Sequence, residues 1–323
     1  MQRSARVADE TLPVVQAAAI EAGDGPAWLV DSLWAEEGVG IVGGAPKCCK
    51  SWLALDLALS VASGTQALGT YAVPRAGPVL LFAAEDPPAT VRSRLAGLAL
   101  GRGLTLEQLP IHVILASSLR LDTDRDQARL HETVARYRPR LLVLDPFVRL
   151  HRIDENSALE VSGVLAYLRD LQRTFHLAVL VVHHARKAGA AGEQAGQSLR
   201  GSGDFHAWGD SNLYLRRRRG ALEMAIEHRS APSPEPITLA LRADERSPPH
   251  LAIAAAGDMP ERRDDIGQRV LDALAAMTGP VTQEAIRAQL QVRLQRVVGA
   301  LRELERDRRI VRSPAGWAIA AEP

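Results

Sequence analysis

Short apolar segments alternate with longer amphipathic segments through most of the chain. The apolar runs are nearly continuous, which is typical of strands buried on both faces of a parallel sheet. In the segments between them, apolar residues recur every three to four positions, as in helices. This alternation predicts an α/β fold, a mostly parallel sheet with helices on both faces. Strands are expected at 39–44, 78–85, 111–116, 141–145 and 177–184, and helices at 51–64, 88–101, 126–137 and 157–175.

The character of the chain changes near residue 188. Residues 188–203 are small and polar, which predicts a loop inside the same domain. Four short strands, expected to be antiparallel additions at one sheet edge, follow at 211–217, 221–230, 237–243 and 250–257.

The last part of the chain has three helical periods and a final hairpin. Thr282 is a favourable N-cap for the middle helix, and Pro-Ala-Gly separates two short apolar runs at its end. This pattern is typical of a winged helix. We therefore expect an N-terminal arm (1–25), an α/β domain (26–257) and a winged-helix domain (258–323), with linker character around 257–265.

Composition limits the possible partners and location. The 39 basic and 38 acidic residues leave a net charge of +1, so binding to nucleic acid or lipid must be local. The two cysteines, Cys48 and Cys49, are adjacent and cannot staple a fold, which predicts a reducing environment. No apolar run reaches the roughly 18 residues of a membrane span, and the first residues lack a secretory pattern. We expect a cytoplasmic protein without a membrane partner.

The segment from Gly44 to Ser51 reads G-A-P-K-C-C-K-S and approximates the phosphate-loop pattern G-x-x-x-x-G-K-[ST]. In such a loop, backbone N–H groups and a helix N-terminus surround phosphates, the lysine neutralises them, and the hydroxyl ligates Mg²⁺. Cys49 replaces the last glycine. The alternative is an ordinary strand-to-helix turn, but the apolar strand before it and the helix after it favour the phosphate loop.

Three further polar positions follow predicted strands. Asp145 ends one strand and is suited to hold a water on the metal, whereas Glu85 follows another and is suited to polarise an attacking water. His183 and His184 end a third strand and are expected to point toward the same site, where a histidine can contact a terminal phosphate. The alternatives are a capping Asp, a first-turn charge and structural histidines.

Together these segments resemble the RecA-like ATPases of the RepA type, the hexameric replicative helicases of plasmids and their relatives. The resemblance covers about residues 27–243 and includes Glu-Asp-Pro after the second strand, His-His after a later one and the run L-R-G-S-G. It implies a RecA-like core, ATP and Mg²⁺ as ligands, hydrolysis at subunit interfaces, and a homo-oligomeric ring of six.

The resemblance also implies roles for individual residues. Lys50 and Ser51 would bind phosphate and Mg²⁺, Glu85 would activate water, Asp145 would hold the metal, and His184 would sense the terminal phosphate. An arginine of the neighbouring subunit would complete the site, with Arg200 or Arg229 as candidates and Arg216–Arg219 as a further possibility. The nucleotide-binding segment comprises Gly44, Ala45, Pro46, Lys47, Cys48, Cys49, Lys50, Ser51 and Trp52.

The cysteines depart from the family pattern. Lys47, Lys50 and the helix N-terminus are expected to favour the thiolate form. One hypothesis is therefore that oxidation or metallation of Cys48 or Cys49 closes the site. The alternative is that cysteine is simply a tolerated small residue there.

The leading functional prediction is an ATP-driven motor that moves along single-stranded DNA. Arg186 and Lys187, at the start of the small-residue loop, are candidate channel residues, and Arg293 and Arg296 are candidate DNA contacts of the winged helix. One rival is a regulatory ATPase without unwinding activity, whose winged helix docks DNA or a protein. Another is a degenerate, non-catalytic DNA binder.

Overall fold

The structure of the chain is a computed structural model. It describes residues 14–20, 25–155, 157–184, 204–218, 221–244, 247–254, 266–277, 279–307 and 309–320. The predicted loop at 188–203 and the predicted linker around 257–265 lie outside the described residues.

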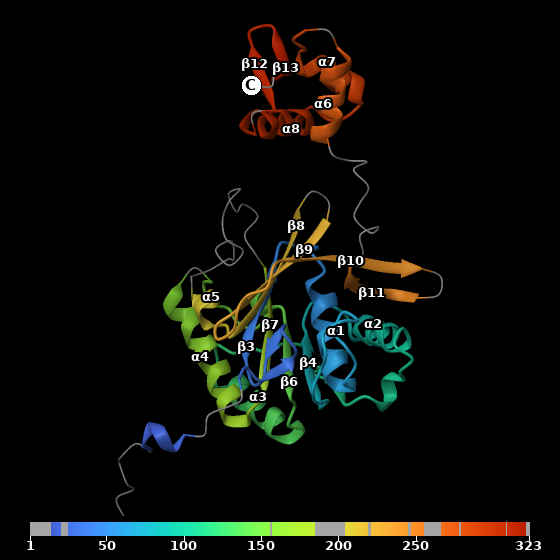
Figure 1. Cartoon of the computed structure of the whole chain (residues 1–323). Helices are drawn as coiled ribbons and strands as arrows, with labels where there is room; N and C mark the ends of the chain where they lie inside the picture. Colours follow the sequence, from blue (N-terminus) through green and yellow to red (C-terminus); the bar gives the residue numbers. More distant parts are fainter. Residues whose placement is uncertain are drawn as a thin grey trace, which may run out of the picture.

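A nine-stranded sheet forms the centre of the larger part of the molecule (Figure 1). Its strand order is β11-β10-β9-β8-β3-β7-β6-β4-β5. The apolar runs predicted as parallel strands are β3 (Val39–Gly44), β4 (Val79–Ala83), β5 (Ile111–Val113), β6 (Leu141–Asp145) and β7 (Ala178–His184). All five are parallel neighbours in the order expected for a doubly covered sheet.

The four later strands extend the sheet beyond β3, but the prediction that all are antiparallel is wrong for the first of them. β8 (Ser211–Arg218) pairs with β3 in parallel, and only β9 (Ala221–His228), β10 (Ile237–Asp244) and β11 (Ser247–Ile253) run antiparallel to their neighbours. The chain returns from the end of β7 to the start of β8 through α5 (Asp204–Trp208), so β8 runs in the same direction as β3.

Helices cover both faces of the sheet. α1 (Lys50–Ser63) and α2 (Pro88–Leu100) pack in the hydrophobic cluster on one face, whereas α3 (Asp124–Tyr137) and α4 (Ala158–Phe175) pack in the cluster on the other. Local sequence explains several boundaries. The side chains of Thr123 and Ser157 cap α3 and α4, and Pro88 occupies the first turn of α2.

The remaining elements are short. The arm contributes a 3₁₀ helix, η1 (Ala17–Ala19), with no buried residue. A small antiparallel pair, β1 (Trp28–Val30) and β2 (Trp34–Ala35), precedes β3, and the 3₁₀ turns η2 (Leu106–Gln108) and η3 (Phe147–Arg149) follow α2 and β6.

The C-terminal segment contains the three helices and the hairpin that were predicted. These are α6 (Ile266–Ala276), α7 (Gln283–Leu290), α8 (Leu294–Arg306), β12 (Ile310–Ser313) and β13 (Gly316–Ile319). Thr282 caps α7 through its side chain, as predicted, by accepting a hydrogen bond from the Ala285 N–H at 3.3 Å. These elements share a hydrophobic cluster of their own.

Among the described helices, none is both long enough and apolar enough to cross a lipid bilayer.

Candidate functional site

Four parallel strands, β3, β7, β6 and β4, end side by side at one edge of the sheet. Gly44 pairs with His184, and Ala83 pairs with Asp145, so the polar residues at these strand ends are brought together. They surround a cavity of about 360 Å³, which is within the usual size range of small-molecule sites. Its walls include residues 47–52 together with Glu85, Asp145 and His184. Carboxyl ends of parallel strands are the common position for such sites.

The chain leaves β3 in a tight turn, and only glycine fits at the first position of this turn, Gly44. Gly44 has a φ of 153°, and a Cβ at this position would lie 2.3 Å from the backbone oxygen of Leu215 in β8. The chain therefore leaves β3 in direct contact with the neighbouring strand. Ala45 is half-buried and Pro46 is exposed, and neither lines the cavity.

Lys50 is buried at the first position of α1. Its Nζ donates hydrogen bonds to the carbonyl oxygens of Gly44 at 3.0 Å and Ala45 at 2.9 Å, so the loop closes over its own lysine. Burial lowers the pKa of Lys50, whereas the neighbouring thiols and the carboxyls of Asp145 and Glu85 raise it. Burial is the largest of these effects on Lys50, and an anionic ligand next to its ammonium group would offset that cost.

Asp145 and Ser51 lie together in the wall of the same cavity. Burial raises the pKa of Asp145 to about 6, a hydrogen bond with the Ser51 side chain lowers it, and the nearby Asp86 and Glu85 raise it. At neutral pH the carboxyl is therefore mostly ionised. A carboxylate and a hydroxyl in contact are the oxygen ligands that Mg²⁺ prefers.

These two side chains fit a magnesium site that is completed by other oxygens. In the described part of the chain, no group of three or more His, Cys, Asp and Glu is arranged to hold a metal. A Mg²⁺ ion held by Ser51 and Asp145 would therefore take its other ligands from a phosphate ligand and water, as it commonly does.

Glu85 lies two residues beyond the end of β4, at the rim of the cavity. Its Oε1 accepts a hydrogen bond from Nε of Arg149 at 3.2 Å, and both side chains are partly exposed. Arg149 belongs to η3, which follows directly on β6. The ion pair therefore joins the chain after β4 to the chain after β6.

The two histidines at the end of β7 face opposite sides of the sheet, so the prediction that both point into the site is wrong for His183. His184 lines the cavity. His183 is 1% exposed and packs against Phe205 and Phe147, with ring centroids 4.3 and 5.7 Å away. Successive side chains of a strand alternate between faces, so two adjacent residues cannot serve one cavity in the same way.

Two charged residues of the cavity wall, Asp86 and Arg94, were given no role from the sequence, although Asp86 belongs to the Glu-Asp-Pro motif. Nη1 of Arg94 lies 2.5 Å from Oδ2 of Asp86, and the Arg94 guanidinium lies 5.3 Å from the ring centre of Trp52. Asp86 directly follows Glu85 in the chain. The position of Arg94, within α2, gave no signal because an arginine on an amphipathic helix is ordinarily a solvated residue.

Cys48 and Cys49 differ in their surroundings. Cys48 is buried, and Cys49 is half-buried at the N-cap of α1 with φ 59° and ψ 23°. Burial raises the pKa of the Cys49 thiol, and this effect exceeds the opposing influence of Arg217 and Lys50. The expectation that the surroundings favour the thiolate form is therefore wrong for Cys49, because its removal from water outweighs the neighbouring cations.

The remaining predicted residues lie away from the cavity or outside the described chain. Arg229 follows β9 at the opposite edge of the sheet, where its Nε lies 3.6 Å from Oδ1 of Asp210. Arg293 and Arg296 are exposed at the N-terminus of α8. Arg186, Lys187 and Arg200 lie outside the described residues.

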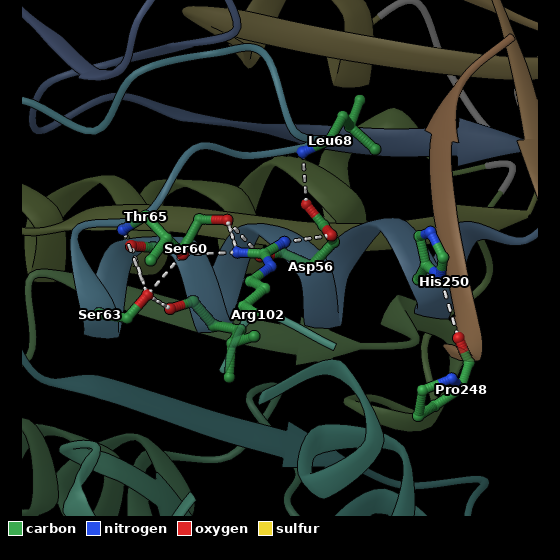
Figure 2. A network of polar contacts seen from close by, with 9 residues as sticks. Asp56, Ser60, Ser63, Thr65, Leu68, Arg102, Pro248 and His250 are labelled. Carbon is green, nitrogen blue, oxygen red and sulfur yellow. Dashed lines mark hydrogen bonds and ion pairs between the residues drawn. The ribbon is translucent and has the colours of Figure 1, made fainter. Parts of the chain in front are cut away.

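Helix α1, which carries Lys50 and Ser51, is anchored by a buried polar network (Figure 2). Asp56, 1% exposed, accepts a hydrogen bond from the Leu68 N–H at 2.8 Å and pairs with Nη2 of Arg102 at 2.5 Å. Nη1 of Arg102 also donates to the hydroxyls of Ser60 and Thr65, at 2.7 and 2.8 Å. Arg102 follows the C-terminus of α2, so the network ties that end of α2 to α1.

Two solved structures are similar to this chain. One is described as "The Structure Of A DnaB-Like Replicative Helicase And Its Interactions With Primase", with a TM-score of 0.51 at 13% identity over 68% of this chain. This chain spans only 58% of the length of that helicase chain. The other, "Crystal structure of the RadB recombinase", has a TM-score of 0.49 at 20% identity and covers 68% of this chain and 92% of that chain.

A family model described as "AAA domain", AAA_25, matches residues 6–190, which is more than half of the chain. The matched segment contains the phosphate-loop residues, Glu85, Asp145 and His184. The chain therefore belongs to the AAA-domain family AAA_25 and has the fold of a RecA-like P-loop ATPase.

Proposed function

We propose that this chain is an ATP-hydrolysing motor of DNA metabolism, of the RepA type, which acts on single-stranded DNA as a homo-oligomeric ring of six. The observation that carries the proposal is the convergence of Lys50, Ser51, Glu85, Asp145 and His184 on one cavity. Random surface clefts rarely combine a buried ammonium, a hydroxyl–carboxylate pair and a further carboxylate at the rim.

Each of these side chains has a distinct task in the proposed hydrolysis. Lys50 exchanges its contacts with the carbonyl oxygens of Gly44 and Ala45 for phosphate oxygens and neutralises their charge. Glu85, oriented by Arg149, accepts a proton from the water whose oxygen attacks the terminal phosphorus, and the bond from that phosphorus to the bridging oxygen breaks.

His184 contributes a hydrogen bond at the end of β7. It lies beside Gly44 in the sheet and lines the same cavity, so it is positioned to contact the terminal phosphate. Bound Mg²⁺, with Ser51 and Asp145 as its protein ligands, would supply charge neutralisation at the phosphates.

The DNA and ring assignments draw on different features. The fold likeness to a DnaB-like replicative helicase supports a motor, and the exposed Arg293 and Arg296 at the start of α8 support a nucleic-acid contact. A winged-helix domain over residues 258–323 is supported by its three helices and hairpin and by the backbone pairing of Val281 with Trp317. An ATPase domain over 26–257 and an arm over 1–25 complete the proposed division.

The alternative is a regulatory ATPase of the same fold without unwinding activity. The observation that favours it is the mixed charge of α8, where Glu303 and Glu305 accompany the arginines. Such a helix is suited to dock a protein partner as well as DNA.

Steady-state ATP hydrolysis by the full chain, with and without single-stranded DNA, tests the proposal. We expect activity that single-stranded DNA stimulates and that Lys50→Ala reduces by at least about 100-fold, because the phosphates lose their buried cation. Measurable activity without any response to DNA would favour the regulator. Equal activity of wild type and Lys50→Ala would contradict the assignment of this cavity as the ATP site.

A further inference from the structure

Strand β8 continues past the point where its partner β3 turns into the phosphate loop. The last paired residues are Gly44 of β3 and Leu215 of β8, and β8 then runs on through Arg218. Figure 1 shows β8 and β9 projecting beyond the end of β3. Arg216, Arg217 and Arg218 therefore lie beside the turn that follows Gly44, beyond the last residue pair of β3 and β8.

Strand alternation assigns the three arginines to two different faces. Leu213 and Leu215 are buried in the cluster that contains α1, whereas Tyr214 belongs to the cluster on the opposite face. Because side chains alternate along a strand, Arg217 continues the face of Leu213 and Leu215. This is the face on which the phosphate loop enters α1.

The three arginines also differ in their partners. Arg216 is paired with Glu223 of β9, with Nε 3.0 Å from Oε2. Opposite Arg217 in β9 is the apolar Leu222, and Arg217 takes part in none of the ion pairs among the described residues. Arg217 is exposed, so its guanidinium is hydrated and able to move.

The register of the sheet places Arg217 close to the phosphate loop of its own subunit. It lies two residues beyond Leu215, whose backbone oxygen would be 2.3 Å from a Cβ at Gly44. The Lys50 side chain, in contrast, donates hydrogen bonds to the carbonyl oxygens of Gly44 and Ala45. Arg217 therefore adds a positive charge on the β8 side of the loop.

We propose that Arg217 binds phosphate oxygens of the nucleotide held by the phosphate loop of the same subunit. The proposal rests on the nucleotide site proposed above and adds a further cation to it. A guanidinium presents paired N–H donors that match phosphate oxygens, and such charge-assisted bonds are among the stronger polar contacts. Arg217 acts within one subunit, unlike Arg229, which lies at the opposite sheet edge.

The test compares Arg217→Ala with Arg218→Ala in the full chain. Both variants remove one exposed arginine from the same strand end, but Arg218 is on the opposite face from the loop. We expect the Kd for a fluorescent ATP analogue, in the presence of MgCl₂, to rise about tenfold in Arg217→Ala and to stay within about twofold of wild type in Arg218→Ala. Arg217→Lys should give an intermediate Kd, because it keeps the charge and loses the paired donors.

Lys50→Ala serves as the reference for the site itself. If Lys50→Ala abolishes binding while Arg217→Ala and Arg218→Ala have equal Kd values, the inference about Arg217 is wrong and the nucleotide site stands. If Lys50→Ala binds the analogue as wild type does, the proposed site is wrong, and the inference falls with it. Thermal unfolding of each variant shows whether it is folded, and Arg217→Gln provides a second neutral substitution if the alanine variant is not.

Discussion

Cys49 has a backbone conformation that normally belongs to glycine. Its φ is 59°, and Lys47, two residues earlier, also has a positive φ of 63°. For an L-residue, the left-handed region costs roughly 1–2 kcal/mol because Cβ approaches the backbone. The loop keeps its turn without the usual last glycine, and helix α1 begins directly after the strained residue. The chain therefore carries local strain where it wraps the proposed phosphate site.

Replacing Cys49 by Gly and by Ala separates this strain from the loss of the thiol. Both substitutions remove the sulfur, but only glycine removes Cβ. We expect Cys49→Gly to be about 1 kcal/mol more stable than Cys49→Ala in denaturant unfolding without nucleotide, because glycine adopts positive φ without a penalty.

The neighbouring cysteine provides the control. Cys48 is not among the residues with positive φ, so Cys48→Gly should be no more stable than Cys48→Ala. An alanine variant at position 49 that equals or exceeds the glycine variant would show that the loop does not hold this residue in the left-handed region.

The buried pair of Asp56 and Arg102 fixes helix α1 relative to the end of α2 (Figure 2). Burial raises the pKa of Asp56, and the Arg102 charge and its hydrogen bond, together with the Leu68 N–H, lower it. The ion pair thus offsets a desolvation penalty. Since α1 begins at Lys50 and α2 begins shortly after Glu85, the contact helps to set the separation of the two ends of the site.

Arg102→Met should destabilise the protein by about 3–5 kcal/mol at pH 8, because a buried carboxylate is left without its cation. The pKa of Asp56 should rise further in this variant. A carboxyl group whose pKa is higher in the folded state binds more protons there than in the unfolded state. It therefore lowers the free energy of unfolding as the pH rises from its unfolded-state pKa through its folded-state pKa. The loss measured by denaturant unfolding should therefore be smaller at pH 5 than at pH 8.

The double variant Asp56→Leu/Arg102→Met is the matched control. It removes both charges and should recover most of the stability lost in Arg102→Met, since apolar replacement of a buried pair is often close to neutral. If the double variant is as unstable as the single one, the loss comes from packing at Arg102 and from its bonds to Ser60 and Thr65.

At the scale of the whole molecule, Arg229 and the proposed phosphate site lie at opposite ends of the strands of the sheet. Gly40 pairs with Ser211, which in turn pairs with His228, so Arg229 lies near the Gly40 end of β3. The proposed phosphate site begins at Gly44, at the other end of this strand. Four strand residues correspond to roughly 13 Å. Arg229 therefore cannot reach the cavity of its own subunit, but a head-to-tail ring would bring that edge to a neighbour.

Mixing two inactive variants tests whether Arg229 acts on a neighbouring subunit. Arg229→Ala keeps an intact cavity, and Lys50→Ala keeps an intact Arg229. In a one-to-one mixture, we expect ATP hydrolysis to recover to as much as about a quarter of the wild-type rate. In random head-to-tail assembly, about a quarter of the interfaces combine an intact cavity with an intact arginine of the neighbouring subunit.

The control mixes Lys50→Ala with Glu85→Gln. Both changes damage the cavity of their own subunit, so no interface contains an intact site, and activity should not recover. Recovery in this control, or none in the first mixture while Arg229→Ala alone is inactive, would contradict a role of Arg229 across the interface.

Most of the fold could be predicted from local patterns. The five central strands, the helices between them and the cap of α7 are each specified by contiguous residues, such as the apolar run of β6 or Thr282 before α7. The candidate phosphate loop could also be recognised in the sequence, since its pattern lies in neighbouring residues of one turn.

Features that depend on contacts between distant segments, such as strand pairing, could not be predicted from the sequence. The direction of β8, the faces of His183 and His184, and the contact of Arg94 with Trp52 join segments far apart in the chain. The side chain of a strand residue faces one layer or the other according to a register set by its partners. Burial raises the pKa of the Cys49 thiol against the opposing influence of Arg217 and Lys50, because desolvation depends on everything packed around the thiol.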